Sequence, residues 1–173
     1  MSDGSPKYYG VYRATVMNNI DPMQMGRIQV IVLDSGGFTP SSWAMPCVPF
    51  TGRQSGTFMV PAIGSGVWVQ FENGDPDQPV WTGGWWGSAA EVPSIALTGN
   101  PVSPSIVLQS GLQNMVMISD LPGPTGGIIL KTTLGAFISI NDVTGITISD
   151  GKGGMINLFG GVITVNQGAL LIK

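Results

Sequence analysis

Short runs of alternating apolar and polar residues, separated by glycine and proline, are the main pattern of this chain. In the first half, residues 8–16, 27–33 and 67–72 alternate with period two, which is typical of half-buried strands. Turn-forming residues follow at 18–22 and 73–77. The 26 glycines and 13 prolines leave few stretches long enough for a helix. The pattern therefore predicts an all-β protein.

A repeat of seven residues marks the C-terminal segment. Gly154, Gly161 and Gly168 are evenly spaced, and an alternating strand follows each of them. Their apolar positions recur in phase, at gaps of two and five that do not match a coiled-coil seam. These candidate shaft-core residues are Ile156, Leu158, Ile163, Val165, Leu170 and Ile172. The repeat indicates a strand, a turn and a strand in regular succession.

Strands this short do not enclose a core within one chain, and their open edges leave backbone groups unpaired. Winding three identical chains together solves both problems. Each strand then pairs with a neighbouring chain, the in-phase apolar residues face a shared axis, and the three glycines turn the corners. We therefore expect an intertwined trimeric β-helix. A single-chain solenoid or a plain β-meander remains the alternative.

The chain divides into three parts by composition. Residues 1–87 carry about five short strands behind a short N-terminal arm, which suits a small barrel, and the OB-fold is the commonest five-stranded choice. Residues 88–127 contain several prolines and predict a linker with transition strands. Residues 128–173 form the expected β-helix shaft.

Charge and composition argue against several functions. Charged residues make up 10% of the chain and the formal net charge is -3, so no basic surface for nucleic acid is expected. The chain has no histidine, which excludes Ser/His/Asp and Cys/His nucleophile systems and removes the usual zinc ligand. Cys47, between Pro46 and Val48, is predicted to be a small buried hydrophobe, with a reactive thiol or an intermolecular link as the alternatives.

The remaining candidate groups favour structural roles. Glu72, Asp75 and Asp77 form the densest carboxylate cluster, but the sequence around them predicts a turn in which such side chains bond to backbone. The adjacent Trp85 and Trp86 favour packing in the barrel or against a neighbour over stacking on a nucleic acid. No catalytic, cofactor-binding or metal-binding residue is assigned.

The N-terminus has no apolar run typical of a signal peptide. No stretch of about eighteen uninterrupted apolar residues occurs in the sequence. We expect synthesis and assembly in the cytoplasm.

Residues 8–87 resemble the OB domain of phage baseplate spike proteins and of the valine-glycine-repeat spikes of type VI secretion systems. The resemblance rests on YGVYRATVMNNIDPMQMGRIQVIV, SSWAMPCVPF and VPAIGSGVWVQFENGDPDQPVWTGGWWG. It implies a non-enzymatic homotrimer in the baseplate of a virion or injection particle. It also implies that an OB collar docks on a separate hub protein and that the β-helix pierces the target cell envelope. The lysozyme domain of the T-even phage version has no counterpart here.

Residues 170–173 are the expected docking surface for a further protein. Leu170, Leu171, Ile172 and Lys173 form the last repeat, and a terminal strand with exposed apolar side chains favours β-augmentation. Without histidine, the chain has no means of forming the metal-sealed apex of some relatives. We expect a separate tip protein, similar to the proline-alanine-alanine-arginine-repeat cones that cap related spikes.

Two other functions remain open on the sequence alone. One is an OB module that binds nucleic acid, which the acidic balance disfavours. The other is a tail-associated enzyme that degrades polysaccharide, which the absence of convincing paired carboxylates disfavours.

Overall fold

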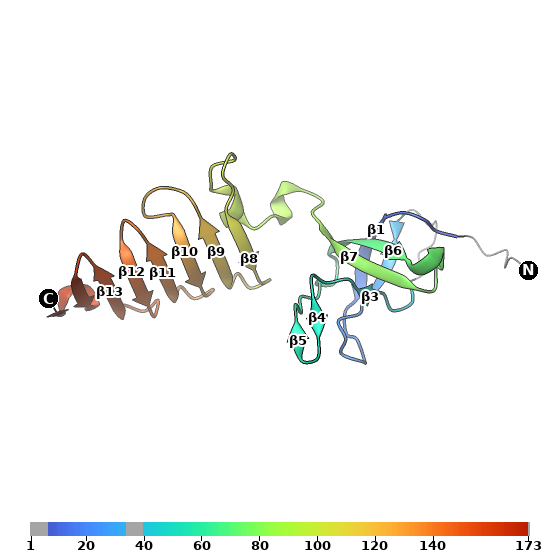
Figure 1. The fold of residues 1–173 in the computed structure, drawn as a ribbon, viewed down its shortest axis with the longest axis horizontal. Helices are drawn as coiled ribbons and strands as arrows, with labels where there is room; N and C mark the ends of the chain where they lie inside the picture. Colours follow the sequence, from blue (N-terminus) through green and yellow to red (C-terminus); the bar gives the residue numbers. More distant parts are fainter. Residues whose placement is uncertain (1–6, 34–39, 173) are drawn as a thin grey trace, which may run out of the picture. The chain divides into compact units, whose positions relative to one another are not determined.

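The computed structural model describes residues 7–33 and 40–172. The chain forms two compact units, Met1–Ala89 and Ala90–Lys173 (Figure 1). Over the described ranges the regular elements are strands and short 3-10 turns, with no α-helix. The all-β class predicted from glycine and proline frequency is therefore confirmed. No helix in those ranges is long and apolar enough to cross a bilayer.

The N-terminal unit is built on a five-stranded sheet of order β2-β1-β6-β7-β3. These strands are β1 (Tyr12–Asn18), β2 (Gln29–Val32), β3 (Met45–Pro46), β6 (Gly66–Phe71) and β7 (Pro79–Trp85). The outer strands β2 and β3 approach each other through an antiparallel bridge between Ile28 and Ala44, which closes the sheet into a barrel. A 3-10 turn, η2 (Glu72–Gly74), begins the connection between β6 and β7. Closure leaves no open sheet edge at this point.

The barrel has a private core. Alternating residues of the strands point inward, as the period-two pattern predicts. The buried hydrophobic residues of the unit are Ala14, Val16, Ile28, Val30, Val32, Ala44, Val67, Val69 and Trp81. Trp81 also donates a hydrogen bond from Nε1 to the carbonyl of Gly26 at 3.1 Å, which ties the core to the loop before β2.

That loop is organised by a buried carboxylate. Asp21 accepts hydrogen bonds from Nε and Nη2 of Arg27 at 3.1 and 2.7 Å. It also accepts backbone N–H groups from Met23, Met25 and Arg27. These bonds, above all those from the Arg27 side chain, hold the pKa of Asp21 well below its ordinary range, although burial acts in the opposite direction. The ionised carboxylate therefore stabilises the loop.

Cys47 corrects one prediction. Its thiol is exposed, whereas the sequence predicted a small buried hydrophobe. The backbone N–H of Cys47 donates to the carbonyl of Trp81, and Val48, the next residue, packs against the core. Because successive residues of an extended chain point to opposite sides, burying Val48 turns Cys47 outward. Beyond it lies a separate two-stranded hairpin, β4 (Thr51–Gly52) with β5 (Ser55–Gly56).

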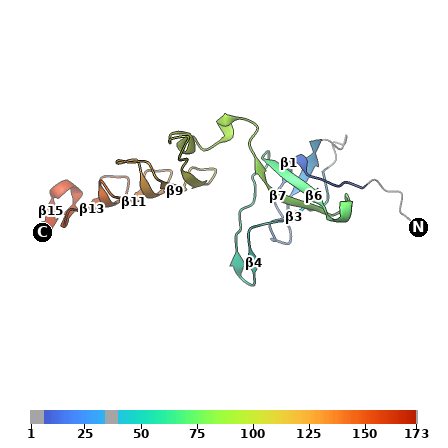
Figure 2. The ribbon, with the colours of Figure 1, turned by 45° about the horizontal axis from the view of Figure 1, so that its top comes forward.

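The C-terminal unit is one sheet of eight antiparallel strands in sequence order. Its strands are β8 (Ile106–Gln109), β9 (Met115–Ser119), β10 (Gly127–Lys131), β11 (Phe137–Asn141), β12 (Gly145–Ser149), β13 (Met155–Phe159), β14 (Val162–Val165) and β15 (Leu170–Ile172). Three 3-10 turns complete the unit or precede it: η3 (Ala89–Glu91), η4 (Ser94–Leu97) and η5 (Asn166–Gly168). Figures 1 and 2 show these strands as a single row. Strands β8 and β9, which fall in the range expected to be linker and transition strands, belong to this sheet.

The strand pairing differs from the expected interchain pairing. Each of β9 to β14 pairs on both sides with its neighbours in the same chain. The backbone donors and acceptors of these six strands are thus used within one chain, so these strands have no edge for a strand of another chain. The connections of a few residues explain this, because an antiparallel neighbour is the nearest partner after a tight turn. The single chain forms the β-meander that the repeat left open as the alternative.

The buried carboxylate predicts a specific acid sensitivity. Because the pKa of Asp21 is lower in the folded state, its stabilising effect is present above the unfolded pKa and is lost as pH falls toward the folded value. The five tryptophans lie between residues 43 and 86, so their fluorescence reports the N-terminal unit. We expect the urea concentration at which half of the parent protein is unfolded to decrease as the pH is lowered below about 5.

Asp21→Asn should lower the urea midpoint at neutral pH and flatten its dependence on acid, because the ion pair with Arg27 is lost. Asp77→Asn is the control, since Asp77 is exposed in a turn. If Asp21→Asn unfolds at the same urea concentration as the parent at neutral pH, the carboxylate does not stabilise this unit.

Candidate subunit interface

The register of the eight-stranded sheet gathers aliphatic side chains on one face. Residues paired across antiparallel strands share a face, so the pairing defines two continuous rows. The first row is Ile106, Ile118, Ile128, Ile140, Ile146, Leu158, Ile163 and Ile172. The second is Leu108, Val116, Leu130, Ile138, Ile148, Ile156, Val165 and Leu170. We call these two rows the apolar face.

The apolar face is open in the single chain. Most of its side chains are between 36% exposed, at Ile163, and 64% exposed, at Ile106. Among the described residues, Met117 is the one buried hydrophobic side chain of this unit, while the rest of the buried core belongs to the barrel. A contiguous apolar surface of this kind is costly in water and marks an interaction site. The sheet therefore lacks the private core that the barrel has.

The opposite face of the same strands is more polar. Between β11 and β14 its central row consists of Ser139, Thr147, Asn157 and Thr164. Asn157 donates hydrogen bonds from Nδ2 to Oγ1 of Thr147 at 2.9 Å and to the carbonyl of Thr144 at 3.1 Å. The sheet thus has one side suited to water and one side that requires cover.

Two turns of the sheet depend on glycine. Gly127 and Gly145 have φ of +92° and +74°, and an added Cβ would lie 2.1 Å from the carbonyl oxygen of Ile140 and 2.0 Å from that of Leu158. Another residue would meet both a disfavoured backbone conformation and a backbone clash. Asn141 stabilises the same region, donating to the carbonyls of Gly123 and Gly126 and accepting from two backbone N–H groups.

The structure places all six candidate shaft-core residues in the two rows, three in each. The ten members from β8 to β12 were not among the six predicted residues. Their signal is the same pair of aliphatic residues two positions apart in every strand, but turns of unequal length interrupt the seven-residue period.

The corner glycines behave differently from one another. Gly161 lies in the turn between β13 and β14 with φ of +79°. Gly154 lies before β13 and accepts a hydrogen bond from the backbone of Asp150, without a positive φ. Gly168 ends the η5 turn. Of the expected tip surface, residues 170–172 form β15, and Lys173 lies outside the described residues.

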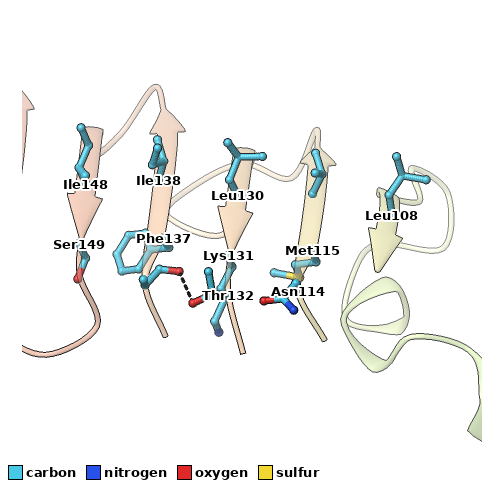
Figure 3. A pocket seen from close by; sticks show the side chains of 12 residues that line it. Leu108, Asn114, Met115, Leu130, Lys131, Thr132, Phe137, Ile138, Ile148 and Ser149 are labelled. Carbon is cyan, nitrogen blue, oxygen red and sulfur yellow. Dashed lines mark hydrogen bonds between the residues drawn. The ribbon is translucent and has the colours of Figure 1, made fainter. Parts of the chain in front are cut away.

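A hollow of about 430 Å³ on the sheet is lined by five residues of this face together with residues at the adjoining strand ends and turns. Figure 3 shows Leu108, Leu130, Ile138 and Ile148 in a line across strands β8, β10, β11 and β12, with Lys131 as the charged residue of the lining. Among the described residues no group of three or more His, Cys, Asp and Glu side chains is placed to hold a metal ion. The arrangement suits packing against another apolar surface better than it suits chemistry.

The carboxylates of the barrel lie in the expected turn. Asp75 accepts the backbone N–H of Asp77 at 3.0 Å, and the backbone of residues 72–78 is closed by further turn hydrogen bonds. Asp75 thus has the turn-stabilising role predicted from the sequence. For Glu72 and Asp77 that prediction is wrong, because their carboxylates accept no hydrogen bond from the described residues.

Two family models match the chain in order. Residues 12–86 match a type VI secretion system and phage-baseplate injector OB domain. Residues 105–171 match a phage baseplate V C-terminal trimerisation domain. A search of curated proteins found no match. The second match covers the strands that carry the apolar face.

If the apolar face is buried between chains, a charge placed on it should disrupt association strongly, whereas a charge at the next position of the same strand should have little effect. Ile163→Asp should expose the C-terminal unit to protease and prevent its self-association, because burying an unpaired carboxylate costs about 2 kcal/mol or more per chain. Thr164→Asp is the matched control, since Thr164 follows on the same strand and points to the other face.

Tryptophan fluorescence should stay native in both variants, because the barrel has its own core. Limited proteolysis and light scattering measure the outcome. Equal protease resistance of the two variants would show that the Ile163 face is not the buried one.

Proposed function

Because the chain belongs to the family of phage baseplate V and type VI secretion spike proteins, we propose that it is the central spike of a contractile injection machine. The observation that carries this proposal is a sheet with a continuous apolar face and no core of its own, within the range matched by a trimerisation domain. A non-enzymatic, structural role agrees with the family.

The trimerisation domain supports a homotrimer. Three copies of the sheet, each turning its apolar face to a common axis, bury the two rows of every chain in one shared core. Threefold symmetry also accounts for two apolar rows that run through the whole sheet, because every strand contributes the same two aliphatic positions. The polar row of Ser139, Thr147, Asn157 and Thr164 then faces water.

The proposed mechanism is mechanical. Sheath contraction supplies the work, and the trimeric shaft transmits it to the target envelope. Stiffness comes from two sources in this account: the hydrogen-bond ladder within each sheet, and the close-packed aliphatic axis between sheets. Bending the shaft requires both to yield together. The barrel units form a collar that docks on a separate hub protein.

A tip protein completes the proposed spike. Within the described residues β15 pairs with β14 alone, so its other edge presents free backbone groups, and Leu170 beside it is 54% exposed. Such an edge favours addition of a strand from another protein.

The assembly test is direct. Light scattering should give three times the chain mass of 18.1 kDa, and electron microscopy of particles that contain the chain should place it on the baseplate axis. A monomer at micromolar concentration, or a location away from the axis, contradicts the proposal.

The proposed binding site on β15 predicts a selective loss of tip-protein binding. Deleting residues 170–173 should abolish capture of the tip protein while leaving the trimer intact, because the other seven strands keep their rows. Pull-down from particles with the deleted and the parent chain measures this. Equal amounts of tip protein on both chains would show that β15 is not its binding site.

A further inference from the structure

An arginine on the outside of the barrel lies against two tryptophans. The guanidinium carbon of Arg13 on β1 is 5.5 Å from the ring centre of Trp68 on β6 and 5.2 Å from that of Trp85 on β7. Neighbouring positions Ala14 and Val67 point into the core, so the three side chains share the outer face. We call this group the Arg13 platform.

The platform is held in place by the barrel. Trp85 donates from Nε1 to the carbonyl of Val67 at 3.1 Å, and its ring covers Gly66, where an added Cβ would lie 2.6 Å from the ring. Glycine at position 66 therefore gives the indole its space. The two rings are 6.4 Å apart and tilted by 54°. A cation held on such rings keeps its position before any partner arrives.

The guanidinium of Arg13 has no hydrogen-bond or ion-pair partner among the described residues, and the residue is exposed. A guanidinium that stacks on aromatic faces still presents its N–H groups at its edge, in a geometry that fits a carboxylate. Tryptophan and arginine are also the residues most enriched at the energetic centres of protein interfaces. The platform is thus complete except for an anionic partner.

The same unit carries a complementary surface elsewhere. The turn between β6 and β7 holds Glu72, Asp75 and Asp77. Asp75 is engaged by the backbone of Asp77, whereas the carboxylates of Glu72 and Asp77 are exposed and have no partner among the described residues. A ring of identical subunits needs two different surfaces on each chain: one that contacts the next copy and one that contacts the previous copy.

We propose that the Arg13 platform of one copy binds the Glu72 or Asp77 carboxylate of the neighbouring copy, and that this contact joins the barrel units into the collar. The inference rests on the proposed homotrimer, because association of the C-terminal sheets raises the effective concentration of one barrel unit at the next. It assigns a role to Trp85, which the sequence left undecided between the barrel and a neighbour.

Cross-linking between differently marked chains tests the contact. Cys47→Ser removes the exposed native thiol. In that background, one chain carries Val11→Cys, two residues before Arg13 on the same face, and the other chain carries Gln78→Cys, beside Asp77. Both positions are exposed. The two chains are co-expressed and treated with a short bismaleimide. We expect cross-linked dimers of the two chains. Arg53→Cys in place of Val11→Cys is the matched control, and it should give none.

Charge exchange decides whether Arg13 itself makes the contact. Arg13→Glu in both chains should reduce the cross-linked dimer about tenfold, as expected for loss of a close interfacial charge pair. Adding Glu72→Lys and Asp77→Lys should restore it, because the pair is then reversed. Cross-linking that persists in Arg13→Glu, or that the reversed pair does not restore, overturns the proposal.

Light scattering on the same samples separates the two levels of the account. A trimer without the cross-link overturns the Arg13 contact and leaves the homotrimer standing. A monomer overturns the homotrimer, and the contact with it.

Discussion

A single-layered sheet has no hydrophobic core of its own. In the C-terminal unit every strand turns two aliphatic residues to the same face, and antiparallel pairing aligns them into continuous rows. Nothing within the described part of the unit covers those rows, and the hydrophobic effect makes their exposure unfavourable. Other copies of the chain supply the cover in the proposed trimer. The shared axis, the polar outer face and the tight glycine turns all follow from this one requirement.

The barrel meets the same physical demand in a different way. Its strands close on themselves through the Ile28–Ala44 bridge, and their inward residues form a core that needs no partner. The loop before β2 adds a buried ion pair between Asp21 and Arg27. In the proposed spike, the self-sufficient barrel forms the collar, and the dependent sheet gains its core from other copies of the chain.

The sequence predicted the fold class and the barrel well, for physical reasons. Frequent glycine and proline rule out long helices, and the turn motifs around Asp21 and Asp75 require defined backbone geometry. The period-two pattern also identified residues of the apolar face near the C-terminus. It did not identify the strand partners. Alternation determines which face a side chain lies on, but it does not determine whether the paired strand comes from the same chain or from another.

Other features depend on tertiary contacts that no local pattern encodes. Cys47 is exposed because Val48 beside it is drawn into the core. The Arg13 platform joins three strands, and its members are separated by up to 72 positions, between Arg13 and Trp85. Gly127 is required because the carbonyl of Ile140, on the neighbouring strand, lies where a Cβ would be. Each of these follows from packing once the register is known.

The central claim is that the C-terminal sheet is stable only when its apolar face is shared. Far-ultraviolet circular dichroism follows the strands of both units, while tryptophan fluorescence reports the barrel alone. A transition seen by circular dichroism and not by fluorescence therefore belongs to the C-terminal sheet. If association and folding of the sheet are one event, the midpoint of its transition rises with chain concentration. A sheet that unfolds at the same temperature at every concentration, and that is native in monomers, would contradict the account.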